Sequence, residues 1–291
     1  MKGKIVRIIS LMLIGIIFGL VSSGCFPAYD TLSQNPDLSE EQDKPTTASS
    51  AFADTSAPQE TPQEIPEIRS QAIPVLYYHS ILNEPGNELR IPPDQFESQM
   101  SYLSHNGYQV VSLAQLFQFY YALGTLPEKP VVITFDDGYE DNYTNAFPIL
   151  KKYGYTATVF AVTSYIDGKG FMSWDQLQEL TDNGWQIEGH TISHPHLLKD
   201  KLSAAELDLE LKEARDTLEK RLGRPVRFFA YPFGDYNADI IQKVEEAGYL
   251  MAFTTQRGWA NSADPLLVPR VYCYANMGIG EFARRLQNPQ Y

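Results

Sequence analysis

Two short segments carry the residue types of a hydrolase that uses a single metal ion. Residues 134–138 read Thr-Phe-Asp-Asp-Gly, and residues 190–194 read His-Thr-Ile-Ser-His. Two imidazoles and one carboxylate are a frequent ligand set for catalytic zinc and leave one position open for water. Asp-Asp-Gly alone is also an ordinary turn sequence, and a lone His is more often structural. The joint occurrence of the two segments, each after an apolar run, favours a metal site.

The flanking residues predict how these side chains are positioned. Residues 131–135 are β-branched and aromatic and the run is broken by Gly138, so Asp136 and Asp137 should lie at the C-terminal end of a buried strand. Residues 185–187 form a second short apolar strand just before the histidines. Because α/β folds keep their chemistry at this end of the strands, we expect the two segments to meet there.

About 220 residues after position 71 show strand candidates alternating with helical patterns, a length that suits one domain. This alternation predicts parallel βα units and a barrel-like α/β fold over residues 72–291. Ser173 and Ser203 begin capping-box patterns, and His105 resembles the last residue of a helix. Cys273 is expected to be a buried strand residue without a disulfide partner. The predicted strands are 73–78, 109–111, 131–135, 157–161, 185–187, 226–231, 251–254 and 267–272.

The amino-terminal residues predict a secreted lipoprotein. Basic residues precede an apolar stretch at 8–21, and small residues lead into Cys25, so residues 1–24 read as a lipoprotein signal peptide. The apolar stretch is shorter than the ~20 residues that a membrane-spanning helix needs. We therefore expect cleavage, lipidation of Cys25 and a location outside the cytoplasm, on a bacterial cell membrane.

Residues 25–71 lack periodic apolar residues and predict a disordered acidic stalk. Residues 26–70 hold nine acidic residues against Lys44 and Arg69, which is −7 of the formal charge of −13 of the whole chain. The acidity therefore belongs mainly to the stalk. The absence of a basic stripe argues against nucleic-acid binding, and we expect a monomer.

Three motifs, at residues 134–138, 190–194 and 227–234, occur in the order and approximate spacing of the polysaccharide deacetylases. The chain from Ile73 onward resembles this family, also described as NodB-homology or carbohydrate esterase family four. The resemblance implies a distorted (β/α) barrel and a hydrolase that removes N-acetyl groups from a polysaccharide. It implies N-acetylglucosamine units, as in poly-N-acetylglucosamine or peptidoglycan.

The predicted chemistry needs a divalent cation and a base. Asp137, His190 and His194 are the predicted ligands, and the ion would polarise an amide carbonyl and lower the pKa of a water molecule towards ~7. Zinc is expected, although this ligand set also suits Co or Ni. Asp136 remains free to act as the base, and the family resemblance assigns the two aspartates in the same way.

Departure of the amine needs an acid, and the segment after Tyr274 contains no His. In most of the family the acid is a His near the C-terminus. His79 ends the first predicted strand here, and its Val-Leu-x-Tyr-His setting resembles a permuted branch that includes deacetylases of poly-N-acetylglucosamine. The resemblance implies that His79 is the acid.

The third motif departs from the common pattern, because Ala230 stands where many members have an arginine that pairs with the catalytic aspartate. Arg270 on the last predicted strand is the preferred replacement, whereas Arg227 and Arg257 are alternatives. For each of them a solvated strand-end arginine is an equally good interpretation.

The backbone N–H of Tyr231 is predicted to stabilise the oxyanion. Tyr139, Pro232 and Phe233 are predicted to line the substrate groove, since they lie within or beside the motifs.

Two other functions compete with this prediction. The chain could be a carbohydrate-binding surface lipoprotein that has lost turnover, or a deacetylase of xylan or of a small amide. Because the metal triad, a base and an acid are all present, the sequence favours the enzyme.

Overall fold

The computed structural model describes residues 71–291, which form the predicted catalytic domain. The predicted signal peptide, Cys25 and the stalk up to residue 70 lie outside the described residues. Within residues 71–291, none of the helices is long and apolar enough to cross a bilayer.

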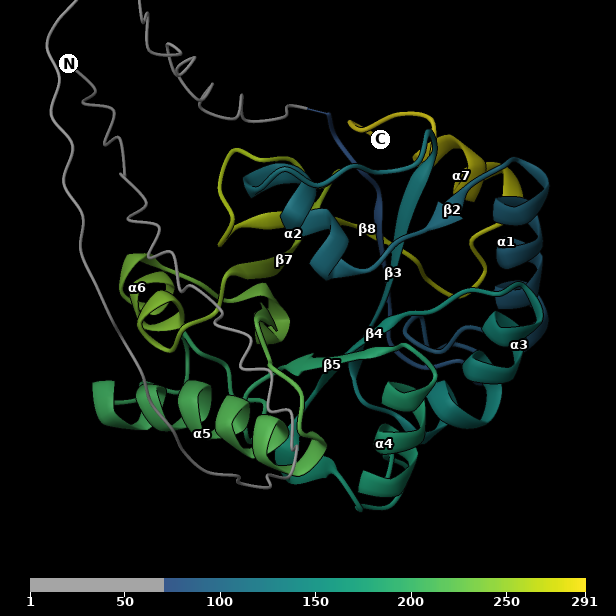
Figure 1. Ribbon diagram of the computed structural model, residues 1–291. Coiled ribbons are helices and arrows are strands. Elements are labelled where there is room, and N and C mark those ends of the chain that lie inside the picture. The colour runs from purple at the N-terminus through teal and green to yellow at the C-terminus, as the bar shows by residue number, and fades with distance from the viewer. Residues whose placement is uncertain (1–70) are drawn as a thin grey trace, which may run out of the picture. The chain divides into compact units, whose positions relative to one another are not determined.

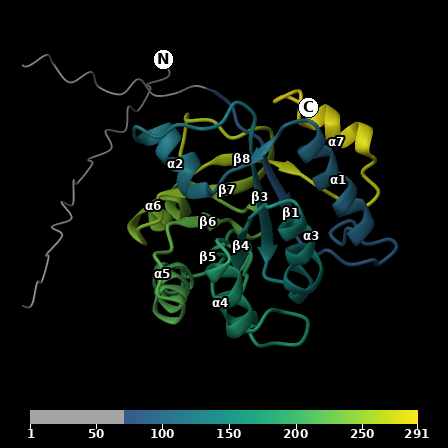
Figure 2. The same cartoon turned by 45° about the vertical axis from the view of Figure 1, so that its right-hand side comes forward.

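Seven parallel strands close into a ring, because β1 pairs with β3 on one side and with β8 on the other (Figure 1; β1 is labelled in Figure 2). The short strand β2 (Gln109–Val110) adds to the N-terminal end of β3. The prediction of an α/β barrel is thus confirmed. In ring order the strands are β1 (Val75–Tyr78), β8 (Val268–Tyr272), β7 (Met251–Arg257), β6 (Phe228–Ala230), β5 (Gln186–Gly189), β4 (Thr158–Ala161) and β3 (Pro130–Asp137).

Helices surround the ring of strands (Figure 2). They are α1 (Pro93–His105), α2 (Leu113–Tyr121), α3 (Phe147–Lys152), α4 (Trp174–Asp182), α5 (Ala204–Leu222), α6 (Ala238–Glu246) and α7 (Ile279–Arg285). Single turns η1 (Asn142–Ala146), η2 (Thr163–Tyr165) and η3 (Pro232–Gly234) follow β3, β4 and β6. These turns lie at the C-terminal ends of strands, where the chemistry was expected.

Alternation along the strands divides the core into two layers. Val75, Val132, Phe160, Phe253 and Val268 point inward and form one cluster with the apolar face of α2. The outward residues of the same strands pack against the surrounding helices in a second, larger cluster. Because β2 leads into α2 at the N-terminal end of β3, α2 covers the barrel interior at the end opposite the motifs.

Local sequence signals explain several element ends. The predicted capping boxes at Ser173 and Ser203 are present, and Ser112 forms a third. Each such cap is worth about 0.5–2 kcal/mol. The predicted end of α1 at His105 is confirmed, and Cys273 is buried and free.

The pairing between β5 and β6 is short, which the predicted strands did not indicate. The two strands share only the residue pair Gly189–Phe229. Here the buried carboxylate of Glu188 accepts the backbone N–H groups of Arg227 and Phe228, each at 2.8 Å. Burial raises the pKa of Glu188 to about 8 although these two hydrogen bonds act to lower it. A side chain thus replaces part of the strand pairing, which a run of apolar residues does not predict.

Replacement of Gly189 is expected to destabilise the fold, because an added Cβ would lie 2.3 Å from the hydroxyl oxygen of Tyr249. That hydroxyl donates a hydrogen bond to the Leu211 carbonyl at 3.0 Å, so it cannot move freely. Gly189→Ala should lower the free energy of unfolding by about 1–3 kcal/mol, the usual range for overpacking. Urea denaturation measures this.

The matched control is Gly280→Ala, since no atom lies within 4 Å of that Cβ position. It should be neutral or slightly stabilising. In a Tyr249→Phe background, Gly189→Ala should cost less than in the wild type. An equal cost in both backgrounds would show that the clash with the hydroxyl is not the cause.

Candidate metal centre and active site

A cavity opens at the C-terminal ends of the strands. Its lining includes residues from the ends of three strands, namely Tyr77, His79, Asp136, Asp137 and His190, together with His194 from the loop after β5. The two predicted motif segments therefore meet at the C-terminal ends of the strands, as expected for parallel βα units.

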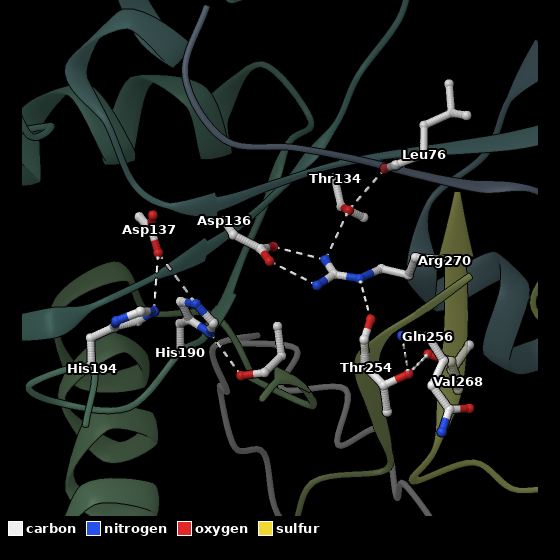
Figure 3. Close-up of polar contacts among 11 residues, drawn as sticks. Leu76, Thr134, Asp136, Asp137, His190, His194, Thr254, Gln256, Val268 and Arg270 are labelled. Atoms are coloured by element: carbon white, nitrogen blue, oxygen red, sulfur yellow. Dashed lines mark hydrogen bonds and ion pairs between the residues drawn. The ribbon is translucent and has the colours of Figure 1, made fainter. Parts of the chain in front are cut away.

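The three predicted metal ligands converge on one point (Figure 3). The Oδ1 atom of Asp137 lies 3.4 Å from Nε2 of His190 and 3.3 Å from Nε2 of His194. The Nδ1–H of His190 donates to the Ala230 carbonyl at 2.7 Å. This contact leaves the Nε2 lone pair of His190 directed at the carboxylate, which is how a metal-binding imidazole is commonly oriented.

The electrostatics of this cluster suit a cation. Burial would raise the pKa of Asp137, but its contact with His190 and the charges of the nearby imidazoles outweigh burial and hold the pKa at about 2. Burial and the neighbouring His190 lower the pKa of His194 to about 4, so its imidazole is neutral near pH 7. Asp137 Oδ1 is buried without a hydrogen-bond partner among residues 71–291. Burial would lower the pKa of His190, but its contact with Asp137 and the charges of the two aspartates raise it, so the cluster favours a positive charge between the carboxylate and the imidazoles. A divalent metal ion would supply that charge.

Arg270 forms a bidentate ion pair with Asp136, inside the barrel and beside the ligand cluster (Figure 3). Its NH1 and NH2 groups donate to Oδ1 and Oδ2 of Asp136 at 2.8 and 2.7 Å. The Nε–H donates to the Thr254 carbonyl at 3.1 Å, and the guanidinium lies 4.2 Å from the ring centre of Tyr77. Arg270 is fully buried.

The structure thus shows which of the three candidate arginines pairs with Asp136. Arg227 and Arg257 are exposed, and only Arg270 lies against Asp136. Burial would raise the pKa of Asp136, but the charge and hydrogen bonds of Arg270 lower it below the usual range. Asp136 is therefore ionised at neutral pH.

His79 lies at the end of β1 and lines the same cavity. Its carbonyl accepts a hydrogen bond from the Asn142 side chain at 2.8 Å, and Asp141 accepts hydrogen bonds from Ser80 Oγ and the Ile81 N–H at 2.6 and 2.7 Å. These contacts fix the backbone around His79. Burial lowers the pKa of His79, although Asp136 and Asp137 act to raise it.

The prediction for the Tyr231 N–H is wrong. This group donates to the Phe253 carbonyl at 3.0 Å, because Tyr231 continues the pairing of β6 with β7. A donor already paired within the barrel cannot stabilise an oxyanion. The N–H of Phe233, two residues later, has no hydrogen-bond partner in the described part of the chain, and Phe233 lines the cavity with a left-handed φ of 57°.

The predicted groove residues divide into two that line the cavity and one that does not. Tyr139 lines it and stacks on Phe171 at 5.1 Å between ring centres, and Phe233 is 51% exposed and stacks on His196 at 3.7 Å. Pro232 is buried and does not line the cavity, so its predicted contact with substrate is wrong.

Sequence reasoning missed several cavity residues. The inward position of Tyr77, two residues before His79 on one strand, could have been predicted from the alternation of β1. Tyr165 comes from the segment after β4, whose path no sequence signal predicted. Phe171 from the same segment was one of several aromatic residues that the sequence offered for stacking on a sugar, and it does line the cavity.

The amino-acid sequence is similar to a family of known proteins and to individual members of it. Residues 123–252 match the family model described as polysaccharide deacetylase. The chain is 36% identical over 189 residues to YxkH of Bacillus subtilis (strain 168), covering 65% of this chain and 66% of that protein. It is 30% identical over 209 residues to a poly-beta-1,6-N-acetyl-D-glucosamine N-deacetylase of Staphylococcus aureus (strain MRSA252), covering 67% of this chain and 71% of that enzyme.

The similarity to some relatives is partial. A poly-beta-1,6-N-acetyl-D-glucosamine N-deacetylase of Escherichia coli (strain K12) is 25% identical over 252 residues, which are 72% of this chain but 38% of that protein. Among solved structures, the deacetylase PplD of Streptococcus pyogenes, in complex with acetate, is similar with a TM-score of 0.71 and 28% identity. That match covers 76% of this chain and 100% of PplD.

The Asp136–Arg270 pair generates a prediction about stability. Arg270→Met should lower the free energy of unfolding by about 3–5 kcal/mol, because it leaves a buried carboxylate without its partner. The Asp136→Asn/Arg270→Met double variant carries no charge at either position of the pair and should be more stable than Arg270→Met alone. Urea denaturation in the presence of chelator measures both without interference from bound metal.

Arg257→Met provides the matched control, since Arg257 is an exposed residue on β7. Its effect should stay within about 0.5 kcal/mol. If the double variant were less stable than Arg270→Met, the unpaired charge would not be the source of the loss.

Proposed function

Because this chain belongs to the polysaccharide deacetylase family, we propose that it is a metal-dependent hydrolase that removes N-acetyl groups from a polymer of N-acetylglucosamine. One observation carries the proposal: Asp137, His190 and His194 converge beside the buried Asp136–Arg270 pair, in a cavity that His79 also lines. This arrangement supplies a cation site, a base and an acid around one position.

Asp137, His190 and His194 would hold the cation, and zinc is the ion we expect. A bound divalent ion would polarise the acetamide carbonyl and lower the pKa of the attacking water. The residues fit this role because His190 keeps its Nε2 lone pair free through its contact with the Ala230 carbonyl.

Asp136 takes the proton from the attacking water. Arg270 keeps this carboxylate ionised and fixes its orientation by two hydrogen bonds. The same pairing lowers the pKa of Asp136 and makes it a weak base. Proton transfer to Asp136 therefore requires a water molecule that is already acidified.

The remaining steps concern the oxygen and the nitrogen of the amide. As the water oxygen bonds to the carbonyl carbon, the N–H of Phe233, which has no hydrogen-bond partner in the described residues, would donate to the developing oxyanion. His79 then gives a proton to the nitrogen as the C–N bond breaks. The products are acetate and a polymer with a free amino group.

The choice of polymer rests on relatives. The matched enzymes of Staphylococcus aureus and Escherichia coli are named for poly-beta-1,6-N-acetyl-D-glucosamine, so we propose this polymer as the substrate. Residues 1–25 support a site of action outside the cytoplasm, with the chain anchored to the membrane through lipidated Cys25.

The experiment is a mass-spectrometric assay of acetyl loss, with and without chelator. The panel contains β-1,6-linked and β-1,4-linked N-acetylglucosamine oligomers, peptidoglycan and acetylated xylan. We expect chelator-sensitive turnover, highest on the β-1,6-linked oligomers. Preference for peptidoglycan or xylan would replace the proposed polymer, and binding without turnover on any substrate would favour a carbohydrate-binding lipoprotein.

The two adjacent aspartates should behave differently when each is changed to asparagine. Asp136→Asn should retain the ion and lose turnover, because its carboxylate bonds Arg270 and lies outside the ligand cluster. Asp137→Asn should lose the ion. Elemental analysis of both purified variants, with deacetylation measured in parallel, tests the division of roles, and equal loss of metal in the two would contradict it.

His79→Ala should lower the catalytic constant on N-acetylglucosamine oligomers by roughly 10²–10⁴-fold, the range for a positioned proton donor. Hydrolysis of 4-nitrophenyl acetate should change little, because a nitrophenolate departs without protonation. His105→Ala, which changes an exposed histidine at the end of α1, is the control and should affect neither reaction.

The pH profile gives a second test of His79. Only the protonated imidazole can donate, and burial lowers the pKa of His79 from its ordinary value of 6.5. Wild-type turnover of the amide should therefore fall as the pH rises through a value below 6.5. An alkaline limb that survives unchanged in His79→Ala would exclude this residue as the acid.

A further inference from the structure

The loop between the two histidine ligands has an unfavourable backbone conformation. Thr191 has φ of 68° and His194 has φ of 57°, so two non-glycine residues are left-handed within four positions. The left-handed region is costly for side chains with a Cβ, and most of all for a β-branched residue such as Thr191. A loop of this kind keeps its shape only when its surroundings hold it.

Part of the support comes from the loop itself and from η2. The Thr191 hydroxyl donates to the His190 carbonyl at 2.5 Å and accepts the His194 N–H at 3.0 Å. The N–H groups of Thr163 and Ser164 donate to the carbonyls of Thr191 and Ile192 at 3.2 and 2.9 Å. These contacts pair the carbonyl groups of the loop and the N–H of His194. The N–H groups of the two central residues, Ile192 and Ser193, still need a partner.

Glu210 on α5 supplies the partner for those groups. Its Oε2 accepts the N–H of Ile192 at 2.8 Å and the N–H of Ser193 at 2.9 Å, and its Oε1 accepts the Ser193 hydroxyl at 2.6 Å. Leu207 and Leu211 on either side of Glu210 are buried, so α5 holds the carboxylate at a defined position. One side chain thus makes three of the hydrogen bonds that define this loop.

We infer that Glu210 is a positioning residue for the metal centre. It holds the loop in the conformation that directs the imidazole of His194 towards Asp137 and His190. The inference deepens the proposed function and depends on its metal site. Because Glu210 lies outside the cavity, it acts through the ligand loop and touches neither substrate nor the reacting atoms.

The carboxylate suits this role because its two oxygens accept all three hydrogen bonds. Glutamine would not test the role, since its amide oxygen could accept both N–H groups while its NH₂ group donates to the Ser193 hydroxyl oxygen. Glu210→Met keeps the length of the side chain and removes both acceptors, so it should break all three hydrogen bonds. Thr191 and His194 would then leave the left-handed conformation, and the His194 imidazole would turn away from Asp137 and His190.

The test measures metal binding by the full chain and needs no substrate. Metal-free wild type and Glu210→Met are titrated with Co²⁺, followed by its visible absorption, and with Zn²⁺ in competition with a chromophoric chelator. We expect roughly 10–100-fold weaker binding in the variant, the range for residues that orient metal ligands. We also expect a changed Co²⁺ spectrum and an apo-protein melting temperature close to that of the wild type.

Glu213→Met is the matched control, because Glu213 lies on the same helix, is exposed and makes none of these contacts. It removes the same charge and should leave metal affinity unchanged. Ser193→Ala removes only the hydrogen bond to Oε1 and should give an intermediate loss. It also keeps the inference testable if Glu210→Met does not fold.

His190→Ala in the same titration separates the two proposals. If His190→Ala binds metal like the wild type, the metal site itself is wrong. If His190→Ala loses the metal while Glu210→Met and Ser193→Ala bind it with wild-type affinity and spectrum, the inference about Glu210 is overturned and the proposed function stands.

Discussion

The buried ion pair between Asp136 and Arg270 is the constraint on which the rest of the site depends. It joins β3 to β8, two strands that do not pair with each other but both pair with β1. A charged pair survives in this interior only because the guanidinium is matched to both carboxylate oxygens and to the Thr254 carbonyl. A shift in the register of β3 or β8 would separate the charges, so the closure of the barrel also determines where Asp136 and the adjacent Asp137 lie.

Contacts that are local in sequence could be predicted, and contacts that depend on strand alignment could not. Asp136, Asp137 and the two histidines follow apolar strands directly, so their meeting at one end of the barrel follows from parallel order. The choice of Arg270 over two other arginines requires knowing which residues of β8 point inward once the ring closes. The pairing of the Tyr231 N–H likewise depends on the alignment of β6 with β7. Glu210 belongs to no motif, since its role arises from the position of a helix beside a loop.

Ring closure also explains how residues at the two ends of the described domain serve one site. The family model covers residues 123–252, so β1 and β8 both lie outside it, yet His79 directly follows β1 and β8 carries Arg270. In a closed ring, the first and last strands of the sequence are neighbours in space. Because β1 and β8 are paired neighbours, a residue at the C-terminal end of either one borders the same cavity. The absence of a histidine after Tyr274 therefore need not leave the reaction without an acid.

The two halves of the candidate metal centre are held by different kinds of interaction. Asp137 ends an eight-residue strand that is paired on both sides, so the backbone ladder positions it. His190 and His194 follow β5, which shares one residue pair with β6, and the loop between them is held by hydrogen bonds to side chains. A ladder distributes its support over many hydrogen bonds, whereas the loop depends on a few. Metal affinity should therefore respond to residues far from the ligands in sequence, while the position of the carboxylates should follow the barrel itself.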